Sequence, residues 1–300
     1  LSCVEPFIDI ALDHRRGIYA KRVSSRAVMT CGSSLQKKEL WLKLNRSASQ
    51  IPQELLSEVI EKVEPHQYSV ESFLISLGKL LPYERFKVNE IAPSLHAFIK
   101  RLPVIGDNLA ITQLIEGVHA YLEKPPFVER RECHVSTEYA WLLKPAVHAV
   151  ERLVEARNSV ALGKTALSIM LMVPAVRYWH EDDFSKYKSD LETLVPSWPE
   201  LNDALYWTTI AQARSAKPIN SGEPLTDDRT VSWLGHFWNF DLTSIPRLLD
   251  YIRSRPLQDD RLVALNPAFR IYVQADKPAH ILSSLQDAVA DEPALQQGLA

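Results

Sequence analysis

Apolar residues recur every three or four positions along most of the chain, which is the spacing of an amphipathic helix. In the clearest example, between Ser136 and Arg157, one stripe contains Tyr139, Leu142, Leu143, Ala146, Val147, Val150, Leu153 and Val154. This spacing predicts a helix with Ser136 as its N-cap. Because proline lacks an N–H and disfavours helical geometry at the preceding residue, we expect a kink or a break at Pro145.

The same spacing predicts about fourteen helices of ten to fifteen residues and no convincing strand. Further ranges are 4–14, 18–31, 35–44, 91–102, 109–122, 160–173, 184–195, 201–216, 230–240, 245–253, 260–273 and 279–290. Two more helices are expected between Pro52 and Pro65 and, capped by Ser69, up to Pro82. In the 260–273 helix, Asp259 is the predicted N-cap, and the predicted inward residues are Leu262, Leu265, Phe269 and Tyr272. The residues after 290 are expected to fray.

Proline is common and glycine is scarce, with nineteen prolines against nine glycines. Prolines punctuate short helices, whereas sheets joined by tight turns usually need glycine. Helices this short need neighbours to cover their apolar stripes. The sequence therefore predicts an all-α fold, a degenerate HEAT-like solenoid of helical hairpins without a strict repeat period. A compact multi-helix domain is the alternative.

The longest predicted loop, 217–229, divides the chain into a helical-repeat array at 1–216 and C-terminal helical repeats at 230–300, which we expect to continue the array. A composition of 46% apolar and 24% charged residues is typical of a soluble globular protein, and no apolar run reaches the roughly 20 residues that span a bilayer. The three widely spaced cysteines form no CxxC pair, which favours a reducing, cytoplasmic location. Because the sequence begins without Met, as if in mid-helix, we expect a fragment of a longer chain.

Three short motifs suggest chemistry without completing a site. Residues 163–165, Gly-Lys-Thr, resemble the end of a phosphate-binding loop, but Asn158 stands where that loop needs glycine. The metal-type ligands at 180–183 are adjacent in sequence, and so are the thiol and imidazole at 132–134, so neither set is spaced to converge. The sequence thus predicts no catalytic residue, no cofactor and no metal. The remaining enzymatic alternative is a helical enzyme whose site is assembled from distant residues.

Charge is unevenly distributed, although the formal net charge is only −3. Residues 1–48 contain nine Lys and Arg against four Asp and Glu, whereas 221–300 contain seven against eleven. Solvated helix faces of varied charge explain such a gradient without a partner. A nucleic-acid-binding solenoid is the functional alternative, and it would use the amino-terminal residues Arg15, Arg16, Lys21, Arg22 and Arg26.

The most unusual composition is the aromatic run 233–240, WLGHFWNF. At helical spacing, Trp233, Phe237 and Phe240 form one stripe, which is typical of a buried core. Trp238 and His236 are then the best candidates for an exposed face, where an aromatic side chain could act as a binding hot spot.

Three segments resemble a known family. They are RAVMTCGSSLQKKELWLKL, VSTEYAWLLKPAVHAVERLVEAR and DDRLVALNPAFRIYVQADKP, and they look like the C-terminal helical half of large bacterial proteins in which a STAND or NACHT-type P-loop ATPase precedes a HEAT- or TPR-like array. The resemblance implies that the array senses a ligand and the ATPase drives assembly, often in antiphage defence. It transfers no individual residue, because this sequence contains no ATPase motif.

From the resemblance and the helical pattern together, we expect a non-catalytic solenoid that recognises a protein partner or ligand and does not insert into a membrane.

Overall fold

The computed structural model describes residues 3–46, 51–63, 69–80, 91–104, 109–130, 133–157, 163–176, 191–215, 237–256 and 258–299. These residues are mostly helical, so the predicted all-α class is confirmed. The chain divides into two compact units, Leu1–Lys188 and Ser189–Ala300. The predicted loop at 217–229 lies outside the described residues.

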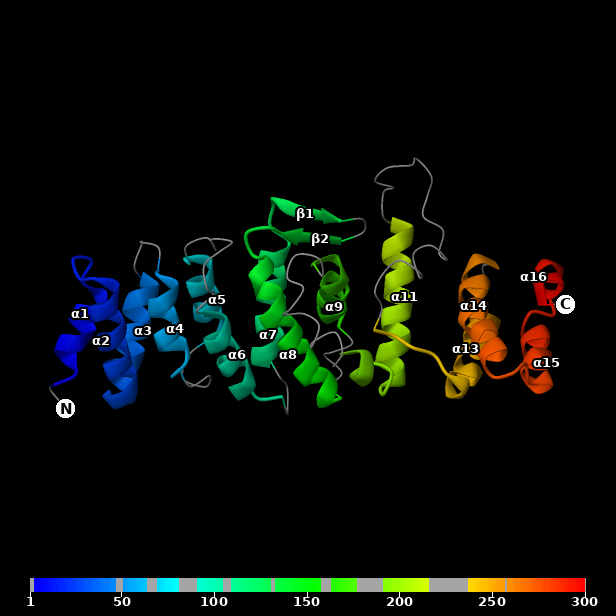
Figure 1. Cartoon of the computed structure of the whole chain (residues 1–300), viewed down its shortest axis with the longest axis horizontal. Helices are drawn as coiled ribbons and strands as arrows, with labels where there is room; N and C mark the ends of the chain where they lie inside the picture. Colours follow the sequence, from blue (N-terminus) through cyan, green and yellow to red (C-terminus); the bar gives the residue numbers. More distant parts are fainter. Residues whose placement is uncertain are drawn as a thin grey trace. The chain divides into compact units, whose positions relative to one another are not determined.

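Unit 1 follows the predicted helices closely (Figure 1). Its elements are α1 Glu5–Leu12, α2 Ile18–Cys31, α3 Ser34–Arg46, α4 Gln53–Ile60, α5 Val70–Gly78, α6 Ile91–Arg101, α7 Leu109–Leu122, β1 Phe127–Arg130, β2 Cys133–Ser136, the 3-10 turn η2 Ala140–Leu142, α8 Leu143–Glu155 and α9 Lys164–Val176. The predicted Ser69 cap is confirmed, because its hydroxyl accepts a hydrogen bond from the Ser72 N–H at 3.2 Å.

Alternate helices of unit 1 contact one another in sequence order. Helix α1 packs on α3, α3 on α5, α5 on α7 and α7 on α9, and we call this set the odd row. Helix α2 packs on α4, α4 on α6 and α6 on α8, and we call this set the even row. Contacts between successive helices, such as α1 with α2 and α7 with α8, join the two rows. Each short helix therefore covers its apolar stripe on several neighbours.

The contact between α5 and α7 in the odd row depends on a glycine. A Cβ added at Gly117 would lie 2.1 Å from a methyl group of Leu74, so this glycine permits the contact. The Tyr121 hydroxyl donates to the Leu74 carbonyl at 2.8 Å, and burial raises the pKa of Tyr121. A side-chain hydrogen bond between His119 Nε2 and Ser168 Oγ, which are 2.9 Å apart, also joins α7 to α9.

The segment before α8 differs from the prediction. Ser136 is the last residue of β2, which pairs antiparallel with β1 through Phe127 and Ser136, so it is not the N-cap of α8. The expectation of no strand was therefore wrong for this hairpin. The Ser136 hydroxyl does accept a hydrogen bond from the Tyr139 N–H at 3.4 Å, as the cap prediction required. Helix α8 begins at Leu143, so Pro145 lies in its first turn and produces no break. Proline is tolerated there because the first N–H groups of a helix have no partner within it.

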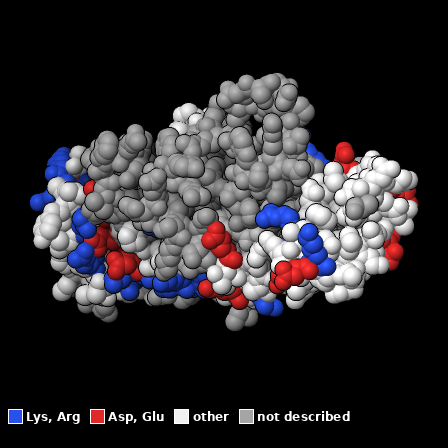
Figure 2. Space-filling view, turned by 45° about the vertical axis from the view of Figure 1, so that its right-hand side comes forward, with Lys and Arg blue, Asp and Glu red and all other residues white. Residues whose placement is uncertain are grey.

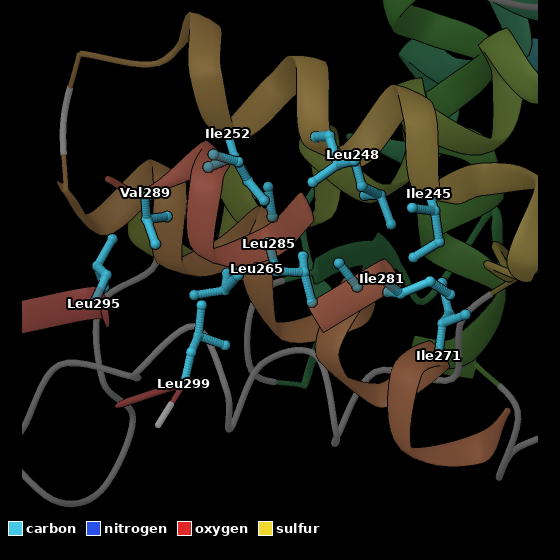
Figure 3. Close-up of a cluster of buried hydrophobic side chains, with 14 residues drawn as sticks. Ile245, Leu248, Ile252, Leu265, Ile271, Ile281, Leu285, Val289, Leu295 and Leu299 are labelled. Atoms are coloured by element: carbon cyan, nitrogen blue, oxygen red, sulfur yellow. The ribbon is translucent and has the colours of Figure 1, made fainter. Parts of the chain in front are cut away.

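Unit 2 is a smaller helical group around one apolar core. Its elements are α11 Pro199–Ser215, the 3-10 turn η4 Leu242–Ser244, α13 Ile245–Ser254, α14 Gln258–Gln274, α15 Ala279–Ala288 and α16 Pro293–Leu299. Side chains of α13 to α16 point into a common cluster (Figure 3), which includes Leu248, Leu265, Leu285 and Leu299. The C-terminal tail is thus an ordered helix, contrary to the expectation of fraying, because its leucines are buried in this core.

Two further sequence predictions were wrong in unit 2. Residues 237–240 are not helical, so the predicted helix 230–240 does not extend over them. In α14, Leu262 and Phe269 were expected to point inward but are 43% and 38% exposed. The helix instead buries a face that includes the small residues Ala264 and Ala268.

The cap predicted for α14 was also misplaced. Asp259 lies inside the helix, which begins one residue earlier at Gln258. An acidic residue in the first turn still interacts favourably with the helix dipole. Asp259 therefore marked the start of α14 correctly to within one residue, although it is not the N-cap.

A buried hydrogen bond links α11 to α14: the Tyr206 hydroxyl donates to the Val263 carbonyl at 2.5 Å. We expect Tyr206→Phe to lower the free energy of unfolding by about 1–2 kcal/mol, because a buried carbonyl then loses its donor. Urea denaturation followed by circular dichroism measures the loss. The matched control is Tyr19→Phe, whose ring is mostly solvent-exposed, and an equal loss in both variants would contradict the assignment.

Candidate binding surface

The five basic residues singled out in the sequence lie on or just before α2. Arg15 and Arg16 are exposed in the turn between α1 and α2, and Arg16 forms an ion pair with Asp13 at 3.5 Å. Lys21 is half-buried on α2. The turn therefore presents cationic groups to solvent, while the helix directs others toward its neighbour.

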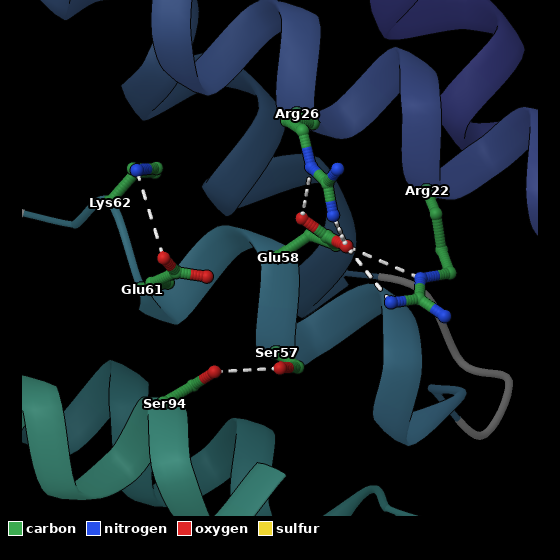
Figure 4. Close-up of polar contacts among 7 residues, drawn as sticks. All are labelled: Arg22, Arg26, Ser57, Glu58, Glu61, Lys62 and Ser94. Atoms are coloured by element: carbon green, nitrogen blue, oxygen red, sulfur yellow. Dashed lines mark hydrogen bonds and ion pairs between the residues drawn. The ribbon is translucent and has the colours of Figure 1, made fainter. Parts of the chain in front are cut away.

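Arg22 and Arg26 both bond to Glu58 of α4 (Figure 4). Arg26 donates from Nε to Oε2 at 2.8 Å and from Nη2 to Oε1 at 2.5 Å, and Arg22 donates from Nη2 to Oε1 at 3.1 Å. Glu58 is only 5% exposed. The hydrogen bond from Arg26 lowers the pKa of Glu58, burial opposes that shift, and Arg22 adds to it. The single negative charge of Glu58 pairs with two guanidinium groups, so the cluster retains a net positive charge.

Removing the charge of Glu58 is expected to loosen α2 from α4. In Glu58→Gln the side chain keeps its size but loses the charge-assisted bonds, so we expect the free energy of unfolding to fall by about 1–3 kcal/mol at neutral pH. Urea denaturation measures this loss.

Because the pKa of Glu58 is lowered in the folded state, its stabilisation is present above the unfolded pKa and is lost as pH falls through the folded pKa. The gap between wild type and variant should therefore close in acid. Glu61→Gln, with its exposed side chain on the same helix end, is the control and should behave as wild type.

The solvent face of α2 carries apolar groups beside this cluster. Tyr19, Val23, Arg26 and Thr30 are exposed and follow one another at helical spacing, with Tyr19 79% exposed. Arginine beside an exposed tyrosine is a composition enriched at protein interfaces. The sequence pattern had indicated the cations here and not the aromatic residue.

Hydrogen bonds from side chains also join the other helices of the even row. Ser57 of α4 and Ser94 of α6 are 2.7 Å apart at their hydroxyl oxygens (Figure 4). Arg101 of α6 donates to the Ile60 carbonyl at 2.9 Å, at the end of α4, and Arg152 of α8 donates to the Ile99 carbonyl near the end of α6. A cation at a helix C-terminus satisfies carbonyls that lack helical partners and complements the helix dipole.

The even row also contains a histidine pair. The rings of His96 on α6 and His148 on α8 stack with centroids 3.9 Å apart, and His148 Nδ1 lies 3.2 Å from Glu151 Oε2. Burial, and next the charge of His148, lower the pKa of His96 to about 4. Sequence reasoning missed this pair, because the two residues come from distant helices and belong to no spaced motif.

Trp238 lies in the core of unit 2, in place of the exposed face expected for it. It is 6% exposed and packs edge-on against Tyr206 with centroids 4.8 Å apart, beside Phe240. His236, the other residue expected on that face, lies outside the described residues. Phe237 is buried as well, so the described part of this aromatic segment contributes large side chains to a core.

The short motifs give no assembled site in the part of the chain that the structure describes. Lys164 and Thr165 begin α9, while the residues before Gly163 and the whole of 180–183 lie outside that part, as do Glu132 and the side chains of 133 and 134. Among the described residues, no three His, Cys, Asp or Glu side chains are grouped to hold a metal ion.

Charge is mixed on the described part of the face shown in Figure 2, where Lys and Arg are interspersed with Asp and Glu. No described helix has the length and apolar character needed to cross a bilayer.

In comparisons with known proteins, no family model, no curated protein and no solved structure matches the chain.

Proposed function

We propose that the chain is a HEAT-like helical-repeat scaffold without catalytic activity, which binds a protein partner on the solvent side of its even row. The observation that supports the proposal is the two-row contact pattern, in which α2 packs on α4, α4 on α6 and α6 on α8. The side-chain bonds within the rows join residues 31 to 53 positions apart, which brackets the repeat of about 40–47 residues in HEAT arrays.

The polar bonds within the even row suit a recognition surface. The Arg22–Arg26–Glu58 cluster, the Ser57–Ser94 contact and the His96–His148 pair each fix one helix against the next. A surface whose helices are held at fixed spacing is pre-organised, so binding loses less conformational entropy. A change of that spacing on binding would pass along the row to neighbouring helices, which is how an array can act as a sensor.

The resemblance to STAND and NACHT-type proteins adds the remainder of the proposal. The scaffold would belong to a longer cytoplasmic chain in which a P-loop ATPase responds to partner binding, as in antiphage sensors. An ATPase module encoded upstream of Leu1 would support this arrangement, and its absence from the full gene would remove it.

Site-specific photocrosslinking tests the binding role. A photoreactive residue replacing the exposed Lys100 of α6, in the even row, is expected to capture a specific protein in the cell of origin. The same residue at the exposed Glu116 of α7, in the odd row, is the matched control and should not capture it. Capture of nucleic acid at Lys100, or of no macromolecule, would overturn the proposal. Equal capture of the same protein at both positions would overturn its assignment to the even row.

A further inference from the structure

The outward face of α2 differs from the rest of the even row because apolar groups are exposed on it. Tyr19 and Val23 lie one turn apart, and Arg26 and Thr30 continue the same line toward the end of the helix. Ile18, the first residue of α2, is exposed as well. The opposite face buries Ser25, Val28 and Met29 against the rest of unit 1, so the helix is well anchored while this side is open.

The charge around these apolar groups is net positive, although Asp13 pairs with Arg16 and Glu58 pairs with Arg22 and Arg26. Helix α2 contains Lys21, Arg22 and Arg26 and no acidic residue, and the exposed Arg15 and Arg16 precede it. Glu58 balances only one of the two guanidinium charges that it contacts, and it holds Arg26 at the edge of the face. A partner that covers Tyr19 and Val23 would therefore meet positive charge at both ends of the apolar line.

Resting on the proposed function, we propose that the α2 face docks an amphipathic helix of a partner protein, with apolar residues against Tyr19 and Val23 and acidic residues against Arg15, Arg16 and Arg26. An amphipathic helix presents apolar groups at i, i+4 and i+7. Tyr19 and Val23 offer it two apolar contacts one turn apart, and Arg26 follows them on the same line. Acidic side chains beside them complement the basic rim, which increases the association rate and fixes the register.

Two features favour a protein over nucleic acid as the occupant. The ring of Tyr19 can stack on a base, but Val23 and Ile18 beside it are aliphatic and cannot, whereas all three can pack on leucine-like side chains. Arg22 and Arg26 are also engaged by Glu58, so phosphate groups would have to compete with a buried carboxylate for them. Arg16 pairs with Asp13, whose side chain is itself partly exposed, so acidic residues of a protein helix meet weaker competition at Arg15 and Arg16 than at Arg22 and Arg26.

Synthetic peptides test the inference on the full chain. The first probe is a fluorescein-labelled amphipathic helix with leucine on one face and glutamate beside it. The second replaces every glutamate by lysine, and the third is a labelled oligo(dT). Fluorescence anisotropy is expected to detect binding of the glutamate peptide alone. Tyr19→Ala and Arg15→Glu should each weaken that binding by about tenfold, as expected for loss of a hot-spot residue or reversal of a rim charge.

Two control variants match these changes in chemistry. Phe269→Ala removes an exposed aromatic ring from α14, and Arg253→Glu reverses an exposed charge on α13, and both should leave binding unchanged. Thermal unfolding should be the same for Tyr19→Ala, Arg15→Glu and Arg253→Glu, because these side chains are exposed. Phe269→Ala also loses a ring contact with Tyr272, so its unfolding temperature should fall while its peptide binding stays unchanged. Absence of binding, equal loss in the controls, or preference for oligo(dT) or the lysine peptide would overturn the α2 assignment. If photocrosslinking at Lys100 still captured a protein, the scaffold proposal would survive that result.

Discussion

Truncation of Phe73 to alanine is expected to lower the free energy of unfolding by about 3–5 kcal/mol, the range for a large aromatic residue removed from a core. Phe73 on α5 is fully buried and stacks on Phe98 of α6, with ring centroids 4.6 Å apart and planes inclined by 23°. Because α5 belongs to the odd row and α6 to the even row, the loss leaves a cavity between the rows and removes a contact that joins them.

Ile75→Ala provides the control for this variant. Ile75 lies on the same helix two residues away, but its side chain is exposed, so its truncation creates no cavity. Urea denaturation followed by circular dichroism should show a large shift of the midpoint for Phe73→Ala and a shift within about 0.5 kcal/mol for Ile75→Ala. Similar effects for both variants would mean that the two rows do not share a packed core at this point.

Local signals predicted those helices whose ends are set by their own sequence. The predicted bounds of α2 and α7 agree with the structure, and the Ser69 cap forms as expected. These features depend on side-chain periodicity and on a hydroxyl within one turn of its N–H partner, so they are readable in a single sequence.

Prediction failed where neighbours in space decided the outcome. Leu265 of α14 is buried as predicted, but the hydrophobicity pattern also selected Leu262 and Phe269, which are partly exposed. The small residues Ala264 and Ala268 are buried in their place. Small residues on α14 allow α13 and α15 to pack closely against it. Packing between helices, and not the apolar pattern, therefore determines which face of α14 is buried. The β1–β2 hairpin escaped prediction because its four-residue strands are too short for a clear alternation of apolar and polar positions.

The candidate surface was predictable only in part, because some of its contacts join residues that are far apart in the sequence. The cations of residues 15–26 are close together in sequence, whereas the carboxylate that binds two of them comes from Glu58, more than thirty residues later. The His96–His148 pair likewise forms only when α6 packs on α8. Contacts between helices of one row depend on which helices stack on each other, and this cannot be inferred from a local sequence pattern.

The His96–His148 pair is expected to make the stability of unit 1 depend on pH. The lowered pKa of His96 has burial as its main cause, and the charges of His148, Lys100 and Lys144 add to it while Glu151 opposes it. As pH falls, the His96 imidazole is therefore protonated near pH 6.5 in the unfolded state but only near pH 4 in the folded state. Stability must rise with pH across this interval, since the unfolded state binds more protons there.

The corresponding loss on acidification is about 3 kcal/mol at most, because each pKa unit is worth 1.36 kcal/mol. We expect urea denaturation of the wild type to show this loss between pH 6.5 and pH 4. In His96→Gln the titrating group is absent, so the decline should be smaller by that amount. His14→Gln removes a histidine whose side chain is 87% exposed, and its pH dependence should match the wild type. If all three proteins lost stability in parallel, burial of His96 against His148 would not be the source of the pH dependence, and protonation of carboxylates such as Glu58 would remain to explain it.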